Sequence, residues 1–231
     1  MESHQKYFEV VYEDNHLIIV NKRSGVLVQG DKSGDIPLSD YIKDYLREKY
    51  QKPGNIFAGV VHRLDRPVSG LVILAKTSKA LERMNKMFQD KAIQKTYWAV
   101  TNKRPKEPDA TLIHWLVKDP QKNTTKAHPK EGKGGQRSEL SYSLLSERKE
   151  FFLLEVKPLT GRPHQIRSQL STIGCSIVGD VKYGYPKANE DASINLHARK
   201  LEFIHPVKKE PLIVYAGLPD NAVWKVFKDY Q

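Results

Sequence analysis

The sequence predicts an α+β fold, in which helices and loops flank a mixed and largely antiparallel β-sheet. Short runs rich in β-branched and aromatic residues recur along the 231 residues between turn-forming residues, as is typical of strands. A few other segments carry apolar side chains at helical spacing. These segments do not alternate regularly with the strands, which argues against a doubly wound parallel sheet. No internal repeat and no linker divides the sequence, so we expect residues 1–231 to form a single domain.

The first part of the chain predicts a hairpin, a helix and two short strands. Phe8–Tyr12 and Leu17–Asn21 are rich in strand-forming residues, and the polar segment between them is typical of a turn. Leu38–Tyr50 has apolar residues at helical spacing and is followed by a Pro-Gly pair, so it predicts a helix. Strands are expected at Gly59–Val61 and at Leu71–Lys76.

The middle of the chain predicts a helix, two strands and an exposed loop. Thr77-Ser78 offers an N-cap for a helix that runs to about Lys91, because apolar residues follow on one side. Strands are expected at Thr96–Thr101 and Thr111–Val117. Residues 121–137 hold five basic residues, three glycines and almost nothing apolar. We expect this segment to be a long exposed loop.

The last part of the chain completes the sheet and adds two helices. A helix is expected from about Arg162, because Pro163 fits a first turn and Ile166 and Leu170 begin an apolar face. The other expected elements are the paired strands Ser141–Ser146 and Phe151–Lys157, the strands Ile194–Ala198 and Leu212–Ala216, and a final helix at Ala222–Tyr230.

Composition narrows the class of protein. Hydrophobic residues make up 39% and charged residues 28% of the chain, which is typical of a globular protein rather than a disordered or fibrous one. The longest apolar runs are too short to cross a bilayer, and the amino terminus lacks the apolar core of a secretion signal. The single cysteine, Cys175, excludes an internal disulfide. We therefore expect a cytoplasmic protein.

The charge balance indicates the kind of partner. Lys and Arg total 38 against 27 acidic residues, a net charge of +11. Such an excess favours a polyanion, with nucleic acid ahead of a membrane surface. A surplus that serves only solubility is the alternative, so function has to be argued from sites.

The first cluster of reactive residues is His62-Arg63-Leu64-Asp65-Arg66, in a predicted loop between two apolar strands. Asp65 is its one carboxylate and is next in sequence to arginine. Nearby guanidinium groups favour the ionised form, which suits a nucleophile better than a general acid. A structural ion pair that fixes a loop is an equally good reading of these residue types.

The second cluster runs from Thr160 to Gln169. On a helix that starts near Arg162, His164 and Arg167 would be neighbours three positions apart. A helix amino terminus with an arginine and free backbone N–H groups suits an anion. The alternative is an ordinary solvated basic helix face.

Several blocks of the sequence, in one order, resemble the motifs of an enzyme family. The run from His62 to Leu71 is similar to the signature H-R-L-D-x-x-T/V-S/T-G-L of the RluA-like family of RNA pseudouridine synthases. The other matching blocks are Tyr12–Lys22, Ser24–Val28, Lys95–Val100, Leu159–Arg167, Gly179–Gly184, Leu196–Ala198 and Phe203–Pro206. The likeness extends from about Phe8 to Ala216, and several ordered motifs are far more specific than a lone H-R-L-D.

The resemblance implies a pseudouridine synthase catalytic domain and gives roles to the matching residues. Asp65 would be the nucleophile that drives detachment and reattachment of uracil, moving its ribose bond from nitrogen to carbon. Tyr97 would stack under the target base, and Arg167 would pair with Asp65 and hold it in place. Arg63 would enter the RNA stack where the target uridine has left, because a base must be extruded before chemistry can reach it.

The resemblance also implies the partners of the site. His62, Arg162 and His164 are expected to bind RNA beside Arg63, since guanidinium in particular both stacks on bases and contacts phosphate. The reaction is an isomerisation without redox change, so it implies neither a metal nor an organic cofactor. We expect ribosomal or transfer RNA as the substrate and a monomer as the default state.

The chain departs from the family pattern at several positions. Arg23 stands where Pro often follows Asn-Lys, Gln29 stands where His is common, and Val68 stands where Thr is common. Many relatives carry an S4-type RNA-binding domain before the catalytic one. The catalytic hairpin here begins within ten residues of the start, so we expect a minimal form without that domain.

RNA affinity would then come from the catalytic domain itself. We expect the basic loop to supply part of it through Lys122, Lys126, Lys130 and Lys133, with phosphate contacts that weaken steeply with salt. The alternative is a flexible surface loop without a role.

Two other functions stay open. The first is a non-catalytic RNA-binding protein on the same fold, which the joint presence of Asp65, Tyr97 and Arg167 argues against. The second is a hydrolase that uses Asp65 with His62 or His164 as a general acid–base pair. The sequence shows no serine or cysteine in a nucleophile elbow and no metal-ligand spacing to support it.

Overall fold

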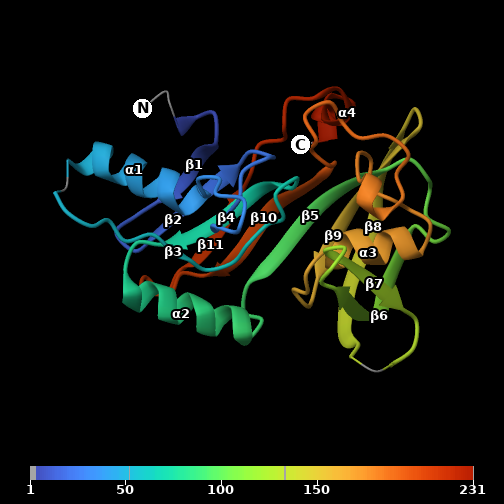
Figure 1. The fold of residues 1–231 in the computed structure, drawn as a ribbon, viewed down its shortest axis with the longest axis horizontal. Coiled ribbons are helices and arrows are strands. Elements are labelled where there is room, and N and C mark those ends of the chain that lie inside the picture. Colours follow the sequence, from blue (N-terminus) through green and yellow to red (C-terminus); the bar gives the residue numbers. More distant parts are fainter. Residues whose placement is uncertain (1–3, 52, 133, 231) are drawn as a thin grey trace. The chain divides into compact units, whose positions relative to one another are not determined.

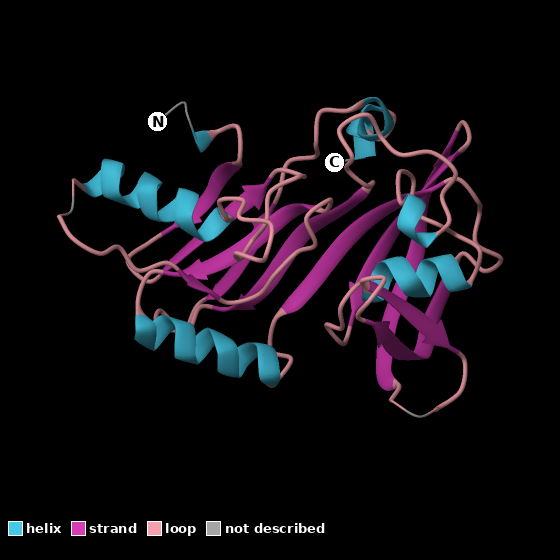
Figure 2. Cartoon of the chain, viewed as in Figure 1, coloured by secondary structure: helices cyan, strands magenta, loops and turns pink. Residues whose placement is uncertain are grey.

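The computed structural model describes residues 4–51, 53–132 and 134–230. The chain forms two compact units (Figure 1, Figure 2). Unit 1 holds residues 1–94 and 198–219, and unit 2 holds residues 95–197 and 220–231. Both units combine antiparallel strands with helices, so the predicted α+β class is confirmed. Within the described part of the chain, no helix is both long and apolar enough to span a membrane.

The strands of unit 1 follow the order β1-β2-β4-β10, with β11 paired to β10 and β3 paired to β4. Their bounds are β1 Phe8–Glu13, β2 Leu17–Lys22, β3 Gly59–Val60, β4 Ser69–Ala75, β10 Leu196–Ile204 and β11 Pro211–Tyr215. The predicted hairpin of β1 and β2 is confirmed, with Val10 opposite Val20. Its turn is shaped by the Asp14 carboxylate, which accepts hydrogen bonds from the backbone N–H groups of His16 and Leu17, both at 2.8 Å.

Two helices lie on opposite sides of the unit 1 sheet, α1 (Leu38–Tyr50) and α2 (Ser78–Gln89) (Figure 1). Thr77 caps α2, as predicted, because its hydroxyl accepts a hydrogen bond from the Ala80 N–H at 3.2 Å. One continuous core lies between α2 and the sheet, made of Leu17, Ile19, Leu71, Ile73, Ala75, Ala80, Met84, Ile93, Leu201, Phe203, Val214 and Ala216. Since β2 and β4 are buried along their whole length, the sheet is covered on both faces.

Gly70 allows the strands to approach closely after the His-Arg-Leu-Asp motif. Its φ of +114° is one that residues with a side chain rarely adopt, and a Cβ atom there would lie 2.4 Å from the backbone of Ala198. The motif is therefore followed at once by tight packing of β4 on β10, which fixes one end of the loop that carries Asp65.

The strands of unit 2 follow the order β5-β9-β8-β6-β7. Their bounds are β5 Gln94–Thr101, β6 Asp109–Asp119, β7 Thr124–His128, β8 Gln136–Arg148 and β9 Phe151–Pro158. Each neighbouring pair is antiparallel, with Tyr97 opposite Val156 and Leu116 opposite Ala127. The paired strands predicted near Ser141–Ser146 and Phe151–Lys157 are confirmed as β8 and β9.

The helical segments of unit 2 are α3 (Gln165–Thr172), the 3-10 turn η2 (Val181–Tyr183), α4 (Ala222–Lys225) and the 3-10 turn η3 (Lys228–Tyr230). α3 packs against β6 and β7. The Gln169 side chain donates to the carbonyl of Leu112 in β6 at 3.1 Å, which ties the helix to the sheet. The helix expected at Ala222–Tyr230 is instead two short pieces, α4 and η3. The buried Trp224 and Phe227 anchor this part of the chain.

The expectation of a long exposed loop at residues 121–137 is wrong in part. Thr124–His128 forms β7, which pairs with β6 so that Lys118 lies opposite Thr125. The strand was not predicted because it contains few apolar residues. In this edge strand buried and exposed side chains alternate, with Thr125 buried and Lys126 exposed, so few apolar residues are needed. Residues 121–128 thus belong to the hairpin of β6 and β7, and Gln136 and Arg137 begin β8.

The expected helix start near Arg162 is also wrong, because α3 begins at Gln165. The Gln165 side-chain oxygen accepts hydrogen bonds from the Arg162 N–H at 3.0 Å and the Thr160 hydroxyl at 2.8 Å. These bonds close a turn before the helix, and His164 takes a left-handed φ of 53°. His164 is therefore the residue before the helix, so it does not share a helix face with Arg167. The strand expected at Ile194–Ala198 likewise begins later, at Leu196.

Candidate active site

Asp65 lies in the loop between β3 and β4 of unit 1. Leu64 and Val68 on either side of it are buried, while Asp65 is half-buried and Arg63 is exposed. The Val68 N–H donates to the Asp65 carbonyl at 3.0 Å, which closes a turn over the aspartate. The buried Leu64 and Val68 thus anchor a loop that carries the half-buried Asp65 and, two residues before it, the exposed Arg63.

His62 holds the start of this loop. Its Nε2 accepts a hydrogen bond from the Ile73 N–H at 3.0 Å, and its ring stacks on Phe88 of α2 with centroids 4.9 Å apart. The imidazole therefore links the loop to β4 and α2. A hydrolase that used His62 as its general acid–base would have to give up this bond, so the geometry argues against that alternative.

A buried lysine lies beneath the loop. Lys22, at the end of β2, is fully buried, and its ammonium donates to the carbonyls of Arg23 at 2.9 Å, Val26 at 3.0 Å and Arg66 at 3.3 Å. Burial lowers the pKa of Lys22 to about 7, although attraction to the Asp65 carboxylate opposes this fall and the nearby Arg66 adds to it. Lys22 therefore joins two loops and carries its charge next to Asp65.

Backbone contacts reinforce the same junction. The Gly25 N–H donates to the Arg66 carbonyl at 2.8 Å, and the Arg66 Nε donates back to the Gly25 carbonyl at 3.0 Å. Arg66 also forms an exposed ion pair with Asp35 at 2.7 Å. The segment after β2 and the segment that carries Asp65 are thus held together from both the buried and the exposed side.

Tyr97 lies in β5 of unit 2 and is half-buried. Its neighbour Lys95 lies close to the turn before α3, because a Cβ atom on Gly161 would sit 3.7 Å from the Lys95 Nζ. Burial lowers the pKa of Lys95. Two of the motifs, Lys95–Val100 and Leu159–Arg167, are therefore adjacent in unit 2 although they are far apart in sequence.

Arg167 is buried in α3 and held by a carboxylate. Its Nε donates to Asp180 Oδ2 at 2.7 Å, and its Nη2 donates to Asp180 Oδ1 at 2.8 Å. A bidentate pair of this kind fixes the plane of the guanidinium as well as its position. A solvated basic helix face is therefore excluded for Arg167. Since Asp65 belongs to unit 1, its pairing with Arg167 stays a prediction.

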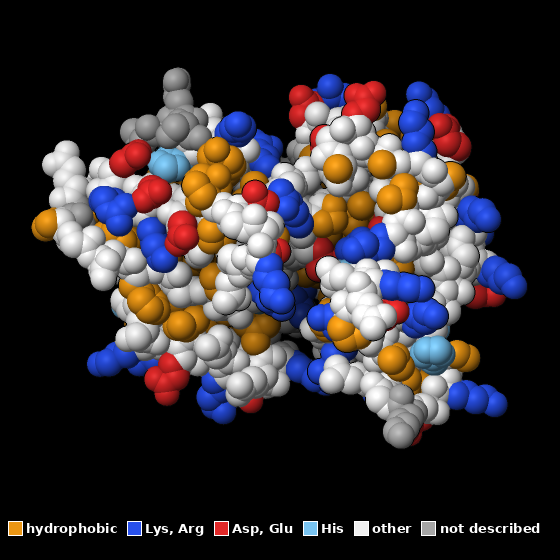
Figure 3. Space-filling model, viewed as in Figure 1, with side chains coloured by type: hydrophobic (Ala, Val, Ile, Leu, Met, Phe, Trp, Pro, Cys, Tyr) orange, Lys and Arg blue, Asp and Glu red, His pale blue; other side chains and the backbone are white. Residues whose placement is uncertain are grey.

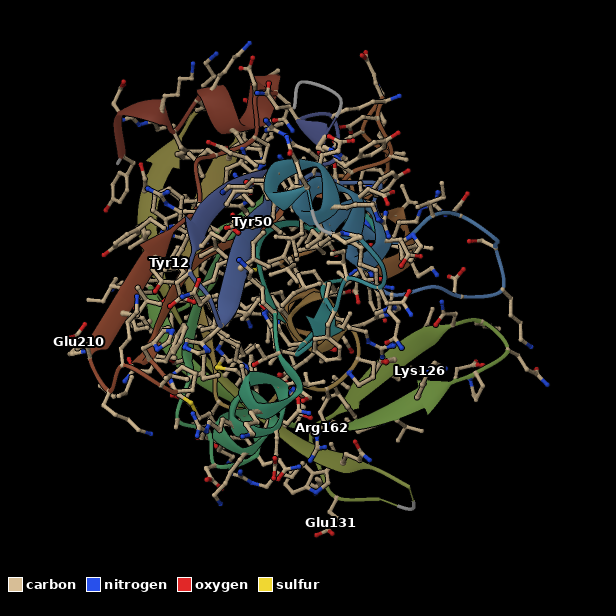
Figure 4. The ribbon with its side chains drawn as sticks, turned by 90° about the vertical axis from the view of Figure 1, so that its left-hand side faces the viewer. Tyr12, Tyr50, Lys126, Glu131, Arg162 and Glu210 are labelled. Carbon is tan, nitrogen blue, oxygen red and sulfur yellow. The ribbon has the colours of Figure 1, made fainter. Side chains whose placement is uncertain are left out.

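The other basic residues of the second cluster lie before α3. Arg162 is exposed on the turn, where Figure 4 labels it. His164 is half-buried, and its Nδ1 lies 2.8 Å from the hydroxyl of Tyr183. The Arg167 Cζ lies 4.9 Å from the centre of the same tyrosine ring. Tyr183 therefore contacts two of the residues that the motifs single out.

The lysines of the predicted basic loop are exposed at separate points of unit 2. Lys122 is in the turn after β6, Lys126 is on β7 and Lys130 follows β7, whereas Lys133 lies outside the described residues. Figure 4 shows Lys126 on the β6–β7 hairpin, and Figure 3 shows Lys and Arg side chains gathered over this part of unit 2. We call the segment from Lys118 to Lys130 the basic hairpin.

Sequence reasoning missed three residues that organise these sites: Lys22, Asp180 and Tyr183. Each of them lies inside a matching block, but nothing in the sequence singled it out. A lysine at the end of an apolar strand, for example, gives no signal that it is buried. Across the described ranges, no three His, Cys, Asp or Glu side chains are grouped in a way that could hold a metal ion.

Comparison with known proteins agrees with the motifs. Residues 16–172 match the sequence profile of the RNA pseudouridylate synthase family. A ribosomal large subunit pseudouridine synthase C of Vibrio cholerae is 30% identical over 225 residues, which are 90% of this chain and 65% of that protein. A tRNA pseudouridine synthase C of the same organism is 29% identical, over 94% of this chain and 93% of that protein. The chain thus spans slightly less than two thirds of the first relative and nearly all of the second.

The fold agrees as well. The solved structure of human RNA pseudouridylate synthase domain containing 4 superimposes with a TM-score of 0.78 at 22% sequence identity, over 95% of this chain and 91% of that one. The members of the matching family are isomerases that act on RNA. On the match of residues 16–172, this chain belongs to the RNA pseudouridylate synthase family.

Proposed function

We propose that this protein isomerises specific uridines in structured ribosomal or transfer RNA to pseudouridine, and that units 1 and 2 together form one catalytic domain. The observation that carries the proposal is the Asp65 loop. A half-exposed carboxylate stands on a loop whose backbone is fixed by Lys22, inside a segment that matches the family profile. The relatives that act on ribosomal and transfer RNA support the substrate class and a site of action in the cytoplasm.

Asp65 acts as the nucleophile in this proposal. The bond between uracil N1 and ribose C1′ breaks, uracil turns, and a bond forms between C5 and C1′. The C5 proton leaves and N1 gains a proton, so substrate and product are isomers with no change in redox state. The reaction therefore needs positioning and charge stabilisation, and its balance requires no cofactor.

Three further residues receive the target nucleotide in the proposed reaction. A base that reacts inside structured RNA has to be turned out of its stack, and a flat partner stabilises it there. Tyr97 supplies that surface, and Arg167 pairs with Asp65 and keeps it oriented. The exposed Arg63, two residues before Asp65, fills the vacated position in the RNA stack.

RNA affinity comes in part from exposed basic residues. Arg162, His164 and the lysines of the basic hairpin lie in unit 2, and the net charge of +11 supports attraction to phosphates. Counterion release makes such binding strongly dependent on salt. Replacing Lys122, Lys126 and Lys130 by glutamine should therefore weaken RNA binding and flatten its salt dependence.

Tritium release tests the proposed function. RNA labelled with tritium at uracil C5 loses the label when the new bond to C5 forms, so the wild-type protein should release tritium from ribosomal or transfer RNA. Asp65→Ala should release none above background, whereas Asp44→Asn, which changes an exposed aspartate of α1, should behave as the wild type does.

The outcomes separate the candidate functions. RNA binding without tritium release by the wild type indicates a binding protein and refutes the enzyme. Release that survives Asp65→Ala refutes the nucleophile but leaves the enzyme. Mapping pseudouridines in RNA from cells with and without the protein then identifies the modified uridine.

A further inference from the structure

Tyr183 is a buried junction inside unit 2 to which the family motifs assign no role. The residue is 8% exposed, and its backbone is fixed because the hydroxyls of Ser171 and Ser176 both donate to its carbonyl, at 2.7 and 2.8 Å. The Tyr183 N–H donates to the Asp180 carbonyl at 3.0 Å. Because its backbone is fixed, Tyr183 can link the positions of the residues that contact its hydroxyl to the positions of those that contact its ring.

The hydroxyl of Tyr183 touches the basic hairpin. It accepts a buried hydrogen bond of 2.8 Å from the backbone N–H of Thr125 in β7. A second, exposed link joins the same elements, since the Lys182 ammonium donates to the Asn123 carbonyl at 3.4 Å. The hairpin that carries Lys122 and Lys126 is therefore tied to η2.

The same side chain touches the residues around Arg167. The Arg167 guanidinium lies over the Tyr183 ring at 4.9 Å while its nitrogens are bonded to Asp180. His164 Nδ1 lies 2.8 Å from the hydroxyl, with the two rings edge to face. Burial raises the pKa of Tyr183, so the hydroxyl keeps its proton at neutral pH and can donate it to His164 while it accepts from Thr125.

We propose that Tyr183 is a positioning residue that couples RNA contacts on the basic hairpin to the placement of Arg167. The hairpin lysines then do more than attract phosphate. When RNA holds the hairpin in one position, the bond from Thr125 holds Tyr183, and Tyr183 holds the guanidinium above its ring. This inference rests on the proposed function, because it gives Arg167 a task in the same reaction.

Attraction and positioning make different kinetic predictions. Attraction alone raises the affinity for RNA and has no effect on the rate once RNA is saturating. Its loss therefore raises KM and leaves kcat unchanged. Positioning of Arg167 acts on the bound complex, so its loss lowers kcat. The effect should need the Tyr183 hydroxyl.

A double-mutant cycle tests the coupling. The first change is Tyr183→Phe, which keeps the ring under Arg167 and removes the hydroxyl. The second is the hairpin triple variant, in which Lys122, Lys126 and Lys130 are replaced by glutamine. The cycle compares kcat for tritium release at saturating RNA in the wild type, both single changes and the combination, because only coupled sites give effects that do not multiply.

Two controls match these changes. Tyr142→Phe removes another buried tyrosine hydroxyl of unit 2, one that donates to the Glu107 carbonyl. Glutamine at the exposed residues Lys106, Lys149 and Lys187 makes the same change of charge elsewhere in unit 2. Neither control should lower kcat, and thermal unfolding verifies that every variant is folded.

We expect the hairpin triple variant and Tyr183→Phe each to lower kcat roughly tenfold, within the range of coupling energies between contacting residues, and the combination to lower it no further. The coupling is overturned if the hairpin change lowers kcat by the same factor with Tyr183 and with Tyr183→Phe. It is also overturned if the hairpin variant raises KM and leaves kcat unchanged. Either result leaves the proposed function intact. A wild type that turns over no RNA overturns the proposed function and the coupling with it. Should Tyr183→Phe fail to fold, the hairpin triple variant still decides, because a kcat equal to that of the wild type at saturating RNA overturns the coupling.

Discussion

A buried cation lies next to the candidate site in each unit, and the two cations are held differently. In unit 1 the Lys22 ammonium donates to three backbone carbonyls, whereas in unit 2 the Arg167 guanidinium is paired with the Asp180 carboxylate. Among the described residues the Lys22 ammonium bonds to carbonyl groups and to no carboxylate, so burial lowers its pKa to about 7. Arginine stays charged in proteins, so its pairing fixes a permanent charge.

The difference separates two ways of orienting a reactive group. Lys22 orients backbone, because its bonds join the segment after β2 to the segment that carries Asp65. Asp180 orients a side chain, because its two oxygens fix the plane of one guanidinium. The order of the Asp65 loop should therefore respond to pH near neutrality, while the placement of Arg167 should not.

The largest effect is expected from Asp180→Asn. Removing one partner of a buried ion pair leaves the other charge uncompensated, which costs about 3–5 kcal/mol of folding free energy. Urea unfolding measures this loss, and tritium release should fall with it because Arg167 is no longer held. Asp220→Asn, at an exposed ion pair of unit 2, should change neither. Unchanged stability of Asp180→Asn would show that the pair does not hold Arg167.

The next effect is a dependence of stability on pH that comes from Lys22. The folded protein releases the Lys22 proton near pH 7, and the unfolded chain keeps it up to about 10.5. Between these values the unfolded state binds more protons, so the stability of the wild type should rise with pH by up to about 1.4 kcal/mol per pH unit. Below pH 7 both states are protonated and the contribution is flat.

Lys22→Met removes this titration. Its stability curve should lack the rise between pH 7 and 10.5, and its kcat should fall because three carbonyls lose their donor and the Asp65 loop loosens. Lys79→Met, at an exposed lysine of α2, should give a curve parallel to that of the wild type. Parallel curves for Lys22→Met as well would contradict the assignment of a buried, titrating lysine.

The third prediction concerns Glu13, a carboxylate of unit 1 that is paired with two lysines. Burial alone would raise the pKa of Glu13, but hydrogen bonds from Lys49, Lys76 and Tyr50 lower it to about 2 from 4.5. The contribution of ionised Glu13 to the folding free energy is therefore fully present above pH 4.5 and is lost as the pH falls towards 2. Glu13→Gln should flatten the acid side of the stability curve by about 1–2 kcal/mol, since the exposed Lys49 lets solvent screen the network. Identical acid denaturation of variant and wild type would refute the network.

The smallest effect is expected from Arg66→Ala. Arg66 joins the same two segments as Lys22 but from the exposed side, through its bond to the Gly25 carbonyl and its ion pair with Asp35. Exposed pairs contribute little, so the loss should be under about 1 kcal/mol and kcat should change less than in Lys22→Met. A larger loss of kcat than in Lys22→Met would show that the exposed contacts of Arg66, rather than the buried bonds of Lys22, hold the Asp65 loop.

The sequence predicted most elements because their signals are local. Leu38–Tyr50 and the Thr77 cap are set by apolar spacing and one hydroxyl, and the structure confirms both. Two of the errors in unit 2 come from contacts that the residue pattern does not reveal. β7 forms by pairing with β6 and by the bond from Thr125 to Tyr183, 58 positions away, and α3 starts late because Gln165 closes a turn with Thr160.

The same limit applies to the candidate site. Asp65, Tyr97 and Arg167 are recognisable because ordered motifs carry them. Lys22, Asp180 and Tyr183 gain their importance from burial and from partners distant in sequence. Asp180 is 13 residues from Arg167, and the carbonyl of Arg66 is 44 residues from Lys22. Spacing alone could not reveal these contacts.

One measurement tests the central claim most directly: single-turnover tritium release by Asp65→Asn, with RNA binding measured in the same sample. The substitution keeps the shape of the side chain and removes its charge, so the loop above Lys22 should stay folded. We predict that the variant binds RNA as the wild type does and releases no tritium above background. Release at the wild-type rate from a folded, RNA-bound variant would contradict the assignment of Asp65 as the nucleophile.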